Sequence, residues 1–243
     1  MWPRVVVKGI LFDFEGTVAH RTDGHLEPVL AEVRNLGYDV YRRELQAAHD
    51  YVLHVGVPRR GVDHVEAFAE AVLKALDLKP KKTELMALAP LFLEYYRFAL
   101  FEDAERAVPA LAKGHKVGVV SGLPGFFVHP VLALVKPRLA AVVTPKEAKA
   151  AVPSPKAFRA AAAALGLRPK EVAVVSADCE DGLAVPKTLG FETVHVGRQG
   201  NVVCPHAKIM VTSLDALETM FKPPAPRAAA LVTAPQPVGA QVK

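Results

Sequence analysis

Five polar side chains in this sequence could form a reactive centre, because each follows an apolar run. Asp13 and Glu15 come after a first run, Ser121 after a second, and Asp178 and Asp181 after a third. In an open parallel sheet the strands' carboxyl ends meet at one edge, where ligands bind. Carboxylates gathered there repel one another unless a cation lies between them, and hard oxygen ligands suit Mg²⁺. A cation so placed allows a carboxylate to attack phosphorus.

The runs that precede these side chains have the composition of buried parallel strands. Residues 5–12 are almost continuously apolar, as expected of a strand covered on both faces. Further strands are predicted at 116–120, 140–143, 172–175, 193–196 and 209–212. Helical patterns separate these strands and indicate βαβ units. The predicted fold class is therefore α/β, with a doubly wound parallel sheet.

A long segment with helical periodicity separates the first two strands. Apolar residues recur there at spacings of three and four, and no strand is predicted between about residues 23 and 100. The tail is rich in proline and alanine, a composition typical of disorder. We therefore expect an α/β core at 1–18 and 103–221, an all-α unit at 19–102 and a disordered tail at 222–243.

The order of these features resembles the haloacid dehalogenase (HAD) superfamily. Residues 11–18 are similar to its first motif, a hydrophobic strand followed by Asp-x-Asp-Gly-Thr. Residues 119–122 are similar to the second motif, residues 142–158 to the third and residues 174–178 to the fourth. The helical insert looks like the cap of the phosphatase and dehalogenase branch. The resemblance covers roughly residues 5–221 and implies a HAD-like, Rossmann-like core with a cap.

The resemblance also implies a role for each polar side chain. Asp13 would be the nucleophile, phosphorylated and then released by water, and Glu15 the general acid and base. Ser121 would bind the transferring phosphoryl group. The implied Mg²⁺ ligands are Asp13, Glu15 and Asp178, with Asp181 as a further candidate. Gly122, Lys149 and Lys156 are the remaining candidates for phosphate contact.

Three positions depart from the family pattern. Residue 15 is Glu where the phosphatases have Asp, which moves the carboxyl outward by roughly 1.5 Å. A misplacement of about 1 Å can cost on the order of 10²-fold in rate. Val152 occupies the position of the family lysine, which Lys149 or Lys156 could replace. Gly182 occupies the position of a second acid in the fourth motif, one residue after Asp181.

Composition and charge argue against several classes of protein. The net charge of +5 is spread along the 243 residues, whereas nucleic-acid binders concentrate basic residues on one face. No apolar run reaches the roughly 18 residues of a membrane helix, and no signal-peptide pattern opens the sequence. Cys179 and Cys204 are too few for a disulfide framework. We therefore expect a reducing, cytoplasmic location and neither a membrane nor a nucleic-acid partner.

The residues and the resemblance together predict a Mg²⁺-dependent phosphatase. It would act on a small phosphorylated metabolite through an aspartyl-phosphate on Asp13. Two alternatives stay open. The departures at Glu15, Val152 and Gly182 favour a catalytically weakened relative that serves as a binding or regulatory module. A carbon–halogen hydrolase of the haloacid dehalogenase type would use the same nucleophile without a metal, although the acidic sheet edge argues against it.

Overall fold

A single sheet of parallel strands forms the centre of the computed structural model, which describes residues 7–22, 24–56, 64–198, 200 and 203–221. Its strands are β1 (Gly9–Asp13), β4 (Lys116–Val120), β5 (Ala141–Val143), β6 (Val172–Ser176), β7 (Glu192–Val196) and β8 (Ile209–Val211). They run in the order β5-β4-β1-β6-β7-β8, so the strand that ends in Asp13 is flanked on both sides. The predicted α/β fold with a parallel sheet is confirmed.

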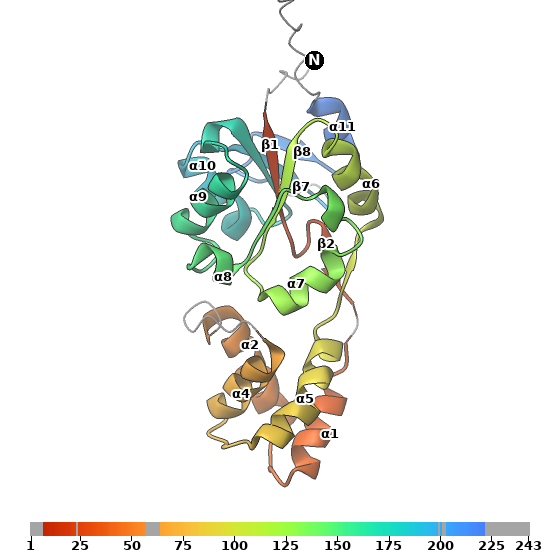
Figure 1. Cartoon of the computed structure of the whole chain (residues 1–243), viewed down its shortest axis with the longest axis vertical. Helices are drawn as coiled ribbons and strands as arrows, with labels where there is room; N and C mark the ends of the chain where they lie inside the picture. Colours follow the sequence, from red (N-terminus) through yellow and green to blue (C-terminus); the bar gives the residue numbers. More distant parts are fainter. Residues whose placement is uncertain (1–6, 23, 57–63, 199, 201–202, 222–243) are drawn as a thin grey trace, which may run out of the picture.

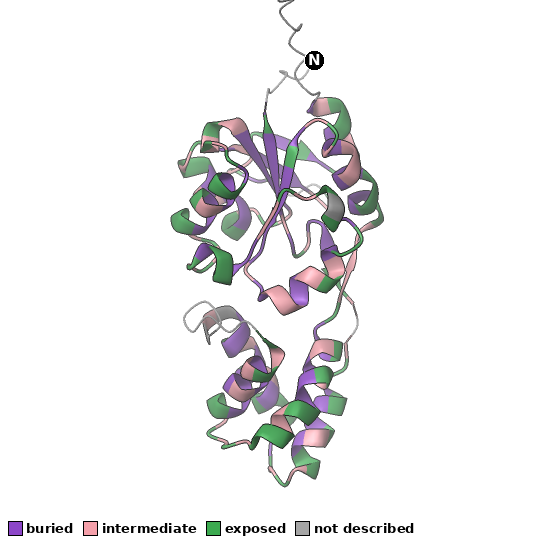
Figure 2. Cartoon of the chain, viewed as in Figure 1, coloured by how far each residue is buried: buried purple, intermediate pink, exposed green. Residues whose placement is uncertain are grey.

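Helices cover both faces of this sheet (Figure 1). The covering helices are α6 (Glu102–Leu111), α7 (Gly125–Leu132), α8 (Pro145–Ala148), α9 (Pro155–Ala164), α10 (Val185–Thr188) and α11 (Ala216–Met220). Because side chains alternate along a strand, Ile10 and Phe12 pack with α6, whereas Leu11 packs with α9. The four inner strands are accordingly buried along almost their whole length, whereas the edge strands β5 and β8 are partly exposed (Figure 2).

A second body of helices lies beyond one end of the sheet (Figure 1). It contains α1 (Glu27–Asn35), α2 (Arg42–Tyr51), the π-helical turn η1 (Val52–Gly56), α4 (Val65–Ala75) and α5 (Lys82–Tyr95). Buried Phe68 and Phe92 meet edge to face inside it, 5.7 Å between ring centroids. None of the helices in the described ranges combines the length and the apolar character needed to cross a bilayer. The tail predicted at 222–243 lies outside the described residues.

A short two-stranded ribbon joins this helical body to the sheet. Strand β2 (Ala19–Arg21) pairs antiparallel with β3 (Phe98–Leu100). The prediction that no strand occurs between residues 23 and 100 is therefore wrong at Phe98–Leu100. A strand of three residues is too short for an alternation of apolar and polar side chains to be recognised in the sequence. Only its pairing with β2 defines Phe98–Leu100 as a strand.

The two cysteines are joined to each other in a disulfide. Cys179 follows β6 and Cys204 follows β7, and the structure bonds them across a sequence separation of 25. The segment that carries Cys204 is also held by the Lys187 ammonium, which donates to the Pro205 carbonyl at 2.7 Å. The sequence analysis expected no disulfide from these two cysteines, and the structure corrects this, because the chain after β7 folds back against the loop after β6.

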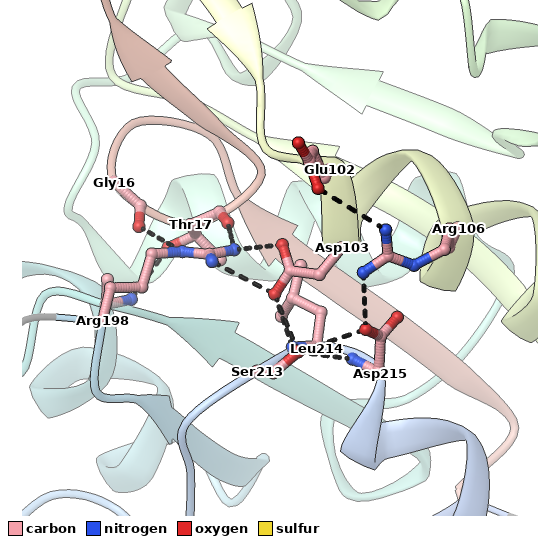
Figure 3. A network of polar contacts seen from close by, with 10 residues as sticks. Gly16, Thr17, Glu102, Asp103, Arg106, Arg198, Ser213, Leu214 and Asp215 are labelled. Atoms are coloured by element: carbon pink, nitrogen blue, oxygen red, sulfur yellow. Dashed lines mark hydrogen bonds and ion pairs between the residues drawn. The ribbon is translucent and has the colours of Figure 1, made fainter.

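A buried ion pair fastens the loop after β1 to the rest of the core (Figure 3). Arg198 donates to both carboxylate oxygens of Asp103, at 3.1 and 3.0 Å. It also donates to the main-chain carbonyls of Gly16 and Thr17. The Leu214 amide donates to Asp103 at 2.9 Å. One arginine thus links α6 to the turn that follows Asp13.

We expect Asp103→Asn to destabilise the fold by about 3 kcal/mol, because it removes the counter-charge of Arg198, whose side chain is only 15% exposed. Burial acts to raise the pKa of the Asp103 carboxyl, but the hydrogen bonds from Arg198 and Leu214 outweigh it and lower the pKa. A lowered folded-state pKa stabilises above the unfolded-state value, near 3.8, and this stabilisation is lost as the pH falls through the folded-state pKa. Denaturant unfolding at several pH values measures both effects.

The matched control is Glu102→Gln on the same helix. Glu102 lies 3.9 Å from Arg106 in an exposed ion pair, which contributes little to stability (Figure 3). We expect this variant to unfold like the wild type. A stability difference for Asp103→Asn that stays constant down to pH 2 would contradict the account.

Candidate active site

The carboxyl ends of β1, β4 and β6 bring polar side chains to one cavity. Asp13 pairs with Val120 in the sheet, so Ser121 lies beside it. The cavity has a volume of about 260 Å³. It is lined by Asp13, Glu15, Leu53, Ser121, Gly122, Leu123, Val152, Pro153, Phe158, Asp178, Asp181 and Gly182. The structure therefore gathers every residue predicted for the site except Lys149 and Lys156.

The Gly-Thr pair after Asp13 shapes the loop that closes this edge. Gly16 has a φ of 73°, a backbone conformation that residues other than glycine seldom adopt. Thr17 is fully buried, and its hydroxyl accepts a hydrogen bond from the Ala177 amide at 2.8 Å. This bond ties the loop after β1 to the loop after β6, and so keeps Asp178 near Asp13.

The Asp13 carboxyl is held in an environment that disfavours its charge. Burial is the largest of the causes that together raise its pKa from 3.8 to about 7, and the neighbouring charges of Asp178 and Glu15 act in the same direction. Hydrogen bonds from Ser176 and from the Phe14 amide act in the opposite direction. The net effect favours the protonated form of Asp13 relative to an exposed aspartate.

Ser176 is a site residue that the sequence analysis did not identify. It is fully buried at the end of β6, and its hydroxyl donates to Asp13 Oδ2 at 2.9 Å. Ser176 Oγ in turn accepts a hydrogen bond from the Asp178 amide at 3.0 Å. The feature that could have identified Ser176 in the sequence is its hydroxyl, which directly follows the apolar run Val172–Val175. Ser176 thus fixes one carboxylate oxygen, while the Phe14 amide fixes the other at 2.8 Å.

Ser121 is positioned by the turn that follows β4. Its oxygen accepts a hydrogen bond from the Leu123 amide at 3.0 Å, and only 1% of the residue is exposed. Since the amide uses a lone pair of the oxygen, the hydroxyl proton is left to donate. This geometry agrees with the predicted phosphate contact, which stays a prediction.

The two acids after β6 lie at the rim of the cavity and are exposed. Asp178 Oδ1 accepts a hydrogen bond from the Asp181 amide at 2.8 Å and so orders the turn between them. This structural role is an alternative to metal binding for Asp178. The two roles are compatible, because a carboxylate has a second oxygen and further lone pairs.

No basic side chain compensates these acids within the described part of the cavity wall. Val152 lines the wall where the family lysine would be. Lys149 and Lys156 are exposed and lie outside the lining, and the Lys156 ammonium donates to the Lys149 carbonyl at 2.9 Å. Their predicted contact with phosphate is thus without support from this arrangement.

The donor set suits a cation that takes few protein ligands. Among the described residues, no three His, Cys, Asp or Glu side chains are grouped to hold a metal ion. Mg²⁺ does not need such a group, since it keeps several waters and is commonly bound through one or two carboxylates. Asp13 and Asp178 provide that number at one cavity.

Comparison with known proteins identifies one family and several similar folds. Residues 7–185 match a family described as haloacid dehalogenase-like hydrolase. No curated protein matches the sequence significantly. A HAD phosphatase from Thermococcus onnurineus is 22% identical, with 88% of this chain and 97% of that chain covered and a TM-score of 0.60. A 2-haloacid dehalogenase from Pseudomonas syringae is 18% identical, with the same coverage and a TM-score of 0.65.

Gly182 leaves the space that Ser176 uses. A Cβ at position 182 would lie 2.0 Å from Ser176 Oγ and 2.5 Å from its Cβ. An acid at position 182 is therefore sterically incompatible with the serine that binds Asp13. Gly182 and Ser176 therefore form one arrangement.

We expect Gly182→Ala to destabilise the protein by about 1–3 kcal/mol, because overpacking forces Ser176 away from Asp13. Adding Ser176→Gly removes both clashing atoms and should restore most of that loss. Unfolding of the wild type, both single variants and the double variant gives the coupling energy directly. Additive effects of the two changes would show that the residues do not share this space.

Proposed function

Because the chain belongs to the haloacid dehalogenase-like hydrolase family, we propose that it is a Mg²⁺-dependent phosphatase of small phosphorylated metabolites. The observation that carries the proposal is the acidic cavity around Asp13. A phosphate monoester adds about two negative charges at neutral pH, and like charges in a partly buried site repel strongly. A divalent cation would remove this repulsion and make phosphate the favoured ligand.

The residues that would hold Mg²⁺ are Asp13 and Asp178, together with the main-chain carbonyl of residue 15. When bound, the ion would neutralise the phosphoryl oxygens and lower the pKa of Asp13. Side chains of this protein would perform the other functions of the site. Asp13 is the nucleophile, the Ser121 hydroxyl donates to a phosphoryl oxygen, and Ser176 orients the attacking carboxylate.

The proposed reaction has two displacements at phosphorus. One Asp13 oxygen forms a bond to phosphorus while the bond to the leaving oxygen breaks, and the Glu15 carboxyl donates its proton to the leaving alcohol. Glu15 then accepts a proton from water as that water attacks the aspartyl-phosphate. Inorganic phosphate leaves, and Asp13 and Glu15 return to their starting states.

We further propose that the helical body acts as a cap over this cavity. Leu53 of η1 lines the same cavity as Asp13, although 40 positions separate the two in the sequence. A wall built from this body excludes water and selects the leaving group. A small phosphorylated molecule in the cytoplasm is the substrate that we infer, although the disulfide removes one reason for that location.

The two alternatives each have one supporting observation. The lack of a basic side chain in the described lining favours a weakened relative that binds ligands without turnover. The apolar side chains of Leu53, Val152 and Phe158 would accommodate a halogenated acid in a dehalogenase. We favour the phosphatase, because the carboxylates at the rim would repel a haloacid that arrives without a cation.

We expect the wild type to hydrolyse p-nitrophenyl phosphate with Mg²⁺ and to lose this activity in EDTA. Asp13→Asn removes the nucleophile and should lower kcat by at least about 10³-fold. Release of p-nitrophenolate measures both rates.

Asp39→Asn is the matched control, since Asp39 is an exposed carboxylate outside the cavity. Equal, metal-independent rates for wild type and Asp13→Asn would refute the phosphatase. Metal-independent release of chloride from 2-chloropropionate would support the dehalogenase instead.

A further inference from the structure

A second cavity adjoins the one that holds Asp13. It has a volume of about 600 Å³ and shares Glu15 and Asp178 with the first. Its other lining residues include Arg21 of β2 and Arg198 after β7. We call this space, which meets the first cavity at Glu15 and Asp178, the Arg21 cavity.

Arg21 is an exposed cation of this cavity and lies against two aromatic rings. Its guanidinium carbon lies 4.8 Å from the Tyr95 ring centroid and 4.4 Å from that of Tyr96. No described carboxylate lies within 4.0 Å of it, in contrast to Arg198, which is bound by Asp103. Two aromatic faces thus hold a planar guanidinium in place and leave its N–H groups available.

This arrangement suits an anion that carries one charge. A stacked guanidinium presents its donors in a fork that matches the two oxygens of a carboxylate. Glu15 and Asp178 also line the cavity, and they would repel a doubly charged phosphate more strongly than a carboxylate. The chemistry therefore favours a carboxylate at Arg21.

We propose that the Arg21 cavity binds the non-transferred part of the substrate, and that Arg21 recognises a carboxylate on it. The substrate class is then a phosphorylated hydroxy acid, whose phosphate and carboxylate are separated by a short carbon chain. This proposal rests on the proposed phosphatase function for the position of the phosphate. Arg21 belongs to the ribbon that joins the helical body to the sheet, so recognition takes place beside that connection.

The test compares 3-phosphoglycerate with glycerol 3-phosphate, which has the same skeleton but a hydroxymethyl group in place of the carboxylate. We expect the wild type to show a KM about tenfold lower for 3-phosphoglycerate, with similar kcat. Arg21→Gln should raise that KM about tenfold and leave glycerol 3-phosphate unaffected. Arg21→Lys should keep part of the preference, since it keeps the charge but not the fork.

Arg97→Gln is the matched control, because Arg97 lies next to β3 and pairs with the exposed Glu94. It should change neither KM. Equal KM values for the two substrates in the wild type would overturn the proposal. The same loss for both substrates in Arg21→Gln would also overturn it, since that pattern indicates a structural role.

A binding measurement separates this proposal from the phosphatase function. D-glycerate carries the carboxylate without the phosphate, and glycerol carries neither. In calorimetric titrations we expect D-glycerate to bind the wild type and Asp13→Asn, but not Arg21→Gln, and glycerol to bind none of them. This binding pattern would support the carboxylate site even if the protein releases no phosphate in the activity assay. If D-glycerate binds the wild type and Arg21→Gln equally, or binds neither, the site is refuted.

Discussion

The Asp13 carboxyl ends a central strand in a cavity where burial and two neighbouring acids oppose its charge. Two hydrogen bonds, from Ser176 and from the Phe14 amide, only partly offset that cost, and the pKa rises to about 7. The ionised form of this carboxyl is the one that could attack phosphorus, and a cation in the cavity would favour that form. The same cation would admit a phosphate. The proposed metal dependence and the proposed choice of phosphate over a haloacid would then both follow from one electrostatic imbalance.

The surrounding structure maintains this imbalance by holding loops that would otherwise separate. Thr17 binds the loop after β6 through the Ala177 amide, and Arg198 binds the carbonyls of Gly16 and Thr17 while it pairs with Asp103. The disulfide joins the residue that follows Asp178 to the segment before β8. Acids that repel one another therefore remain together because the main chain on each side of them is fixed.

The sheet and the acidic residues of the site could be predicted because their signals are local. Apolar runs that end in Asp13, Ser121 and Asp178 show both the strands and the edge where they meet. The ribbon strand Phe98–Leu100 and the disulfide were missed, because each is defined by a partner far away in the sequence. The relation between Ser176 and Gly182 was missed for a similar reason. From the sequence alone, Gly182 indicates only that the acid of the family pattern is missing. The structure shows that Ser176 Oγ occupies the space beside this glycine.

The most direct test of this account is the titration of the Asp13 carboxyl carbon by ¹³C NMR, with Asp13→Asn used to assign the resonance. Without metal the account predicts a midpoint near 7. With saturating Mg²⁺ it predicts a midpoint lower by about 1–3 pH units, since an opposite charge favours the ionised form. A midpoint close to 3.8 without metal would contradict the central claim, as would a midpoint that Mg²⁺ leaves unchanged.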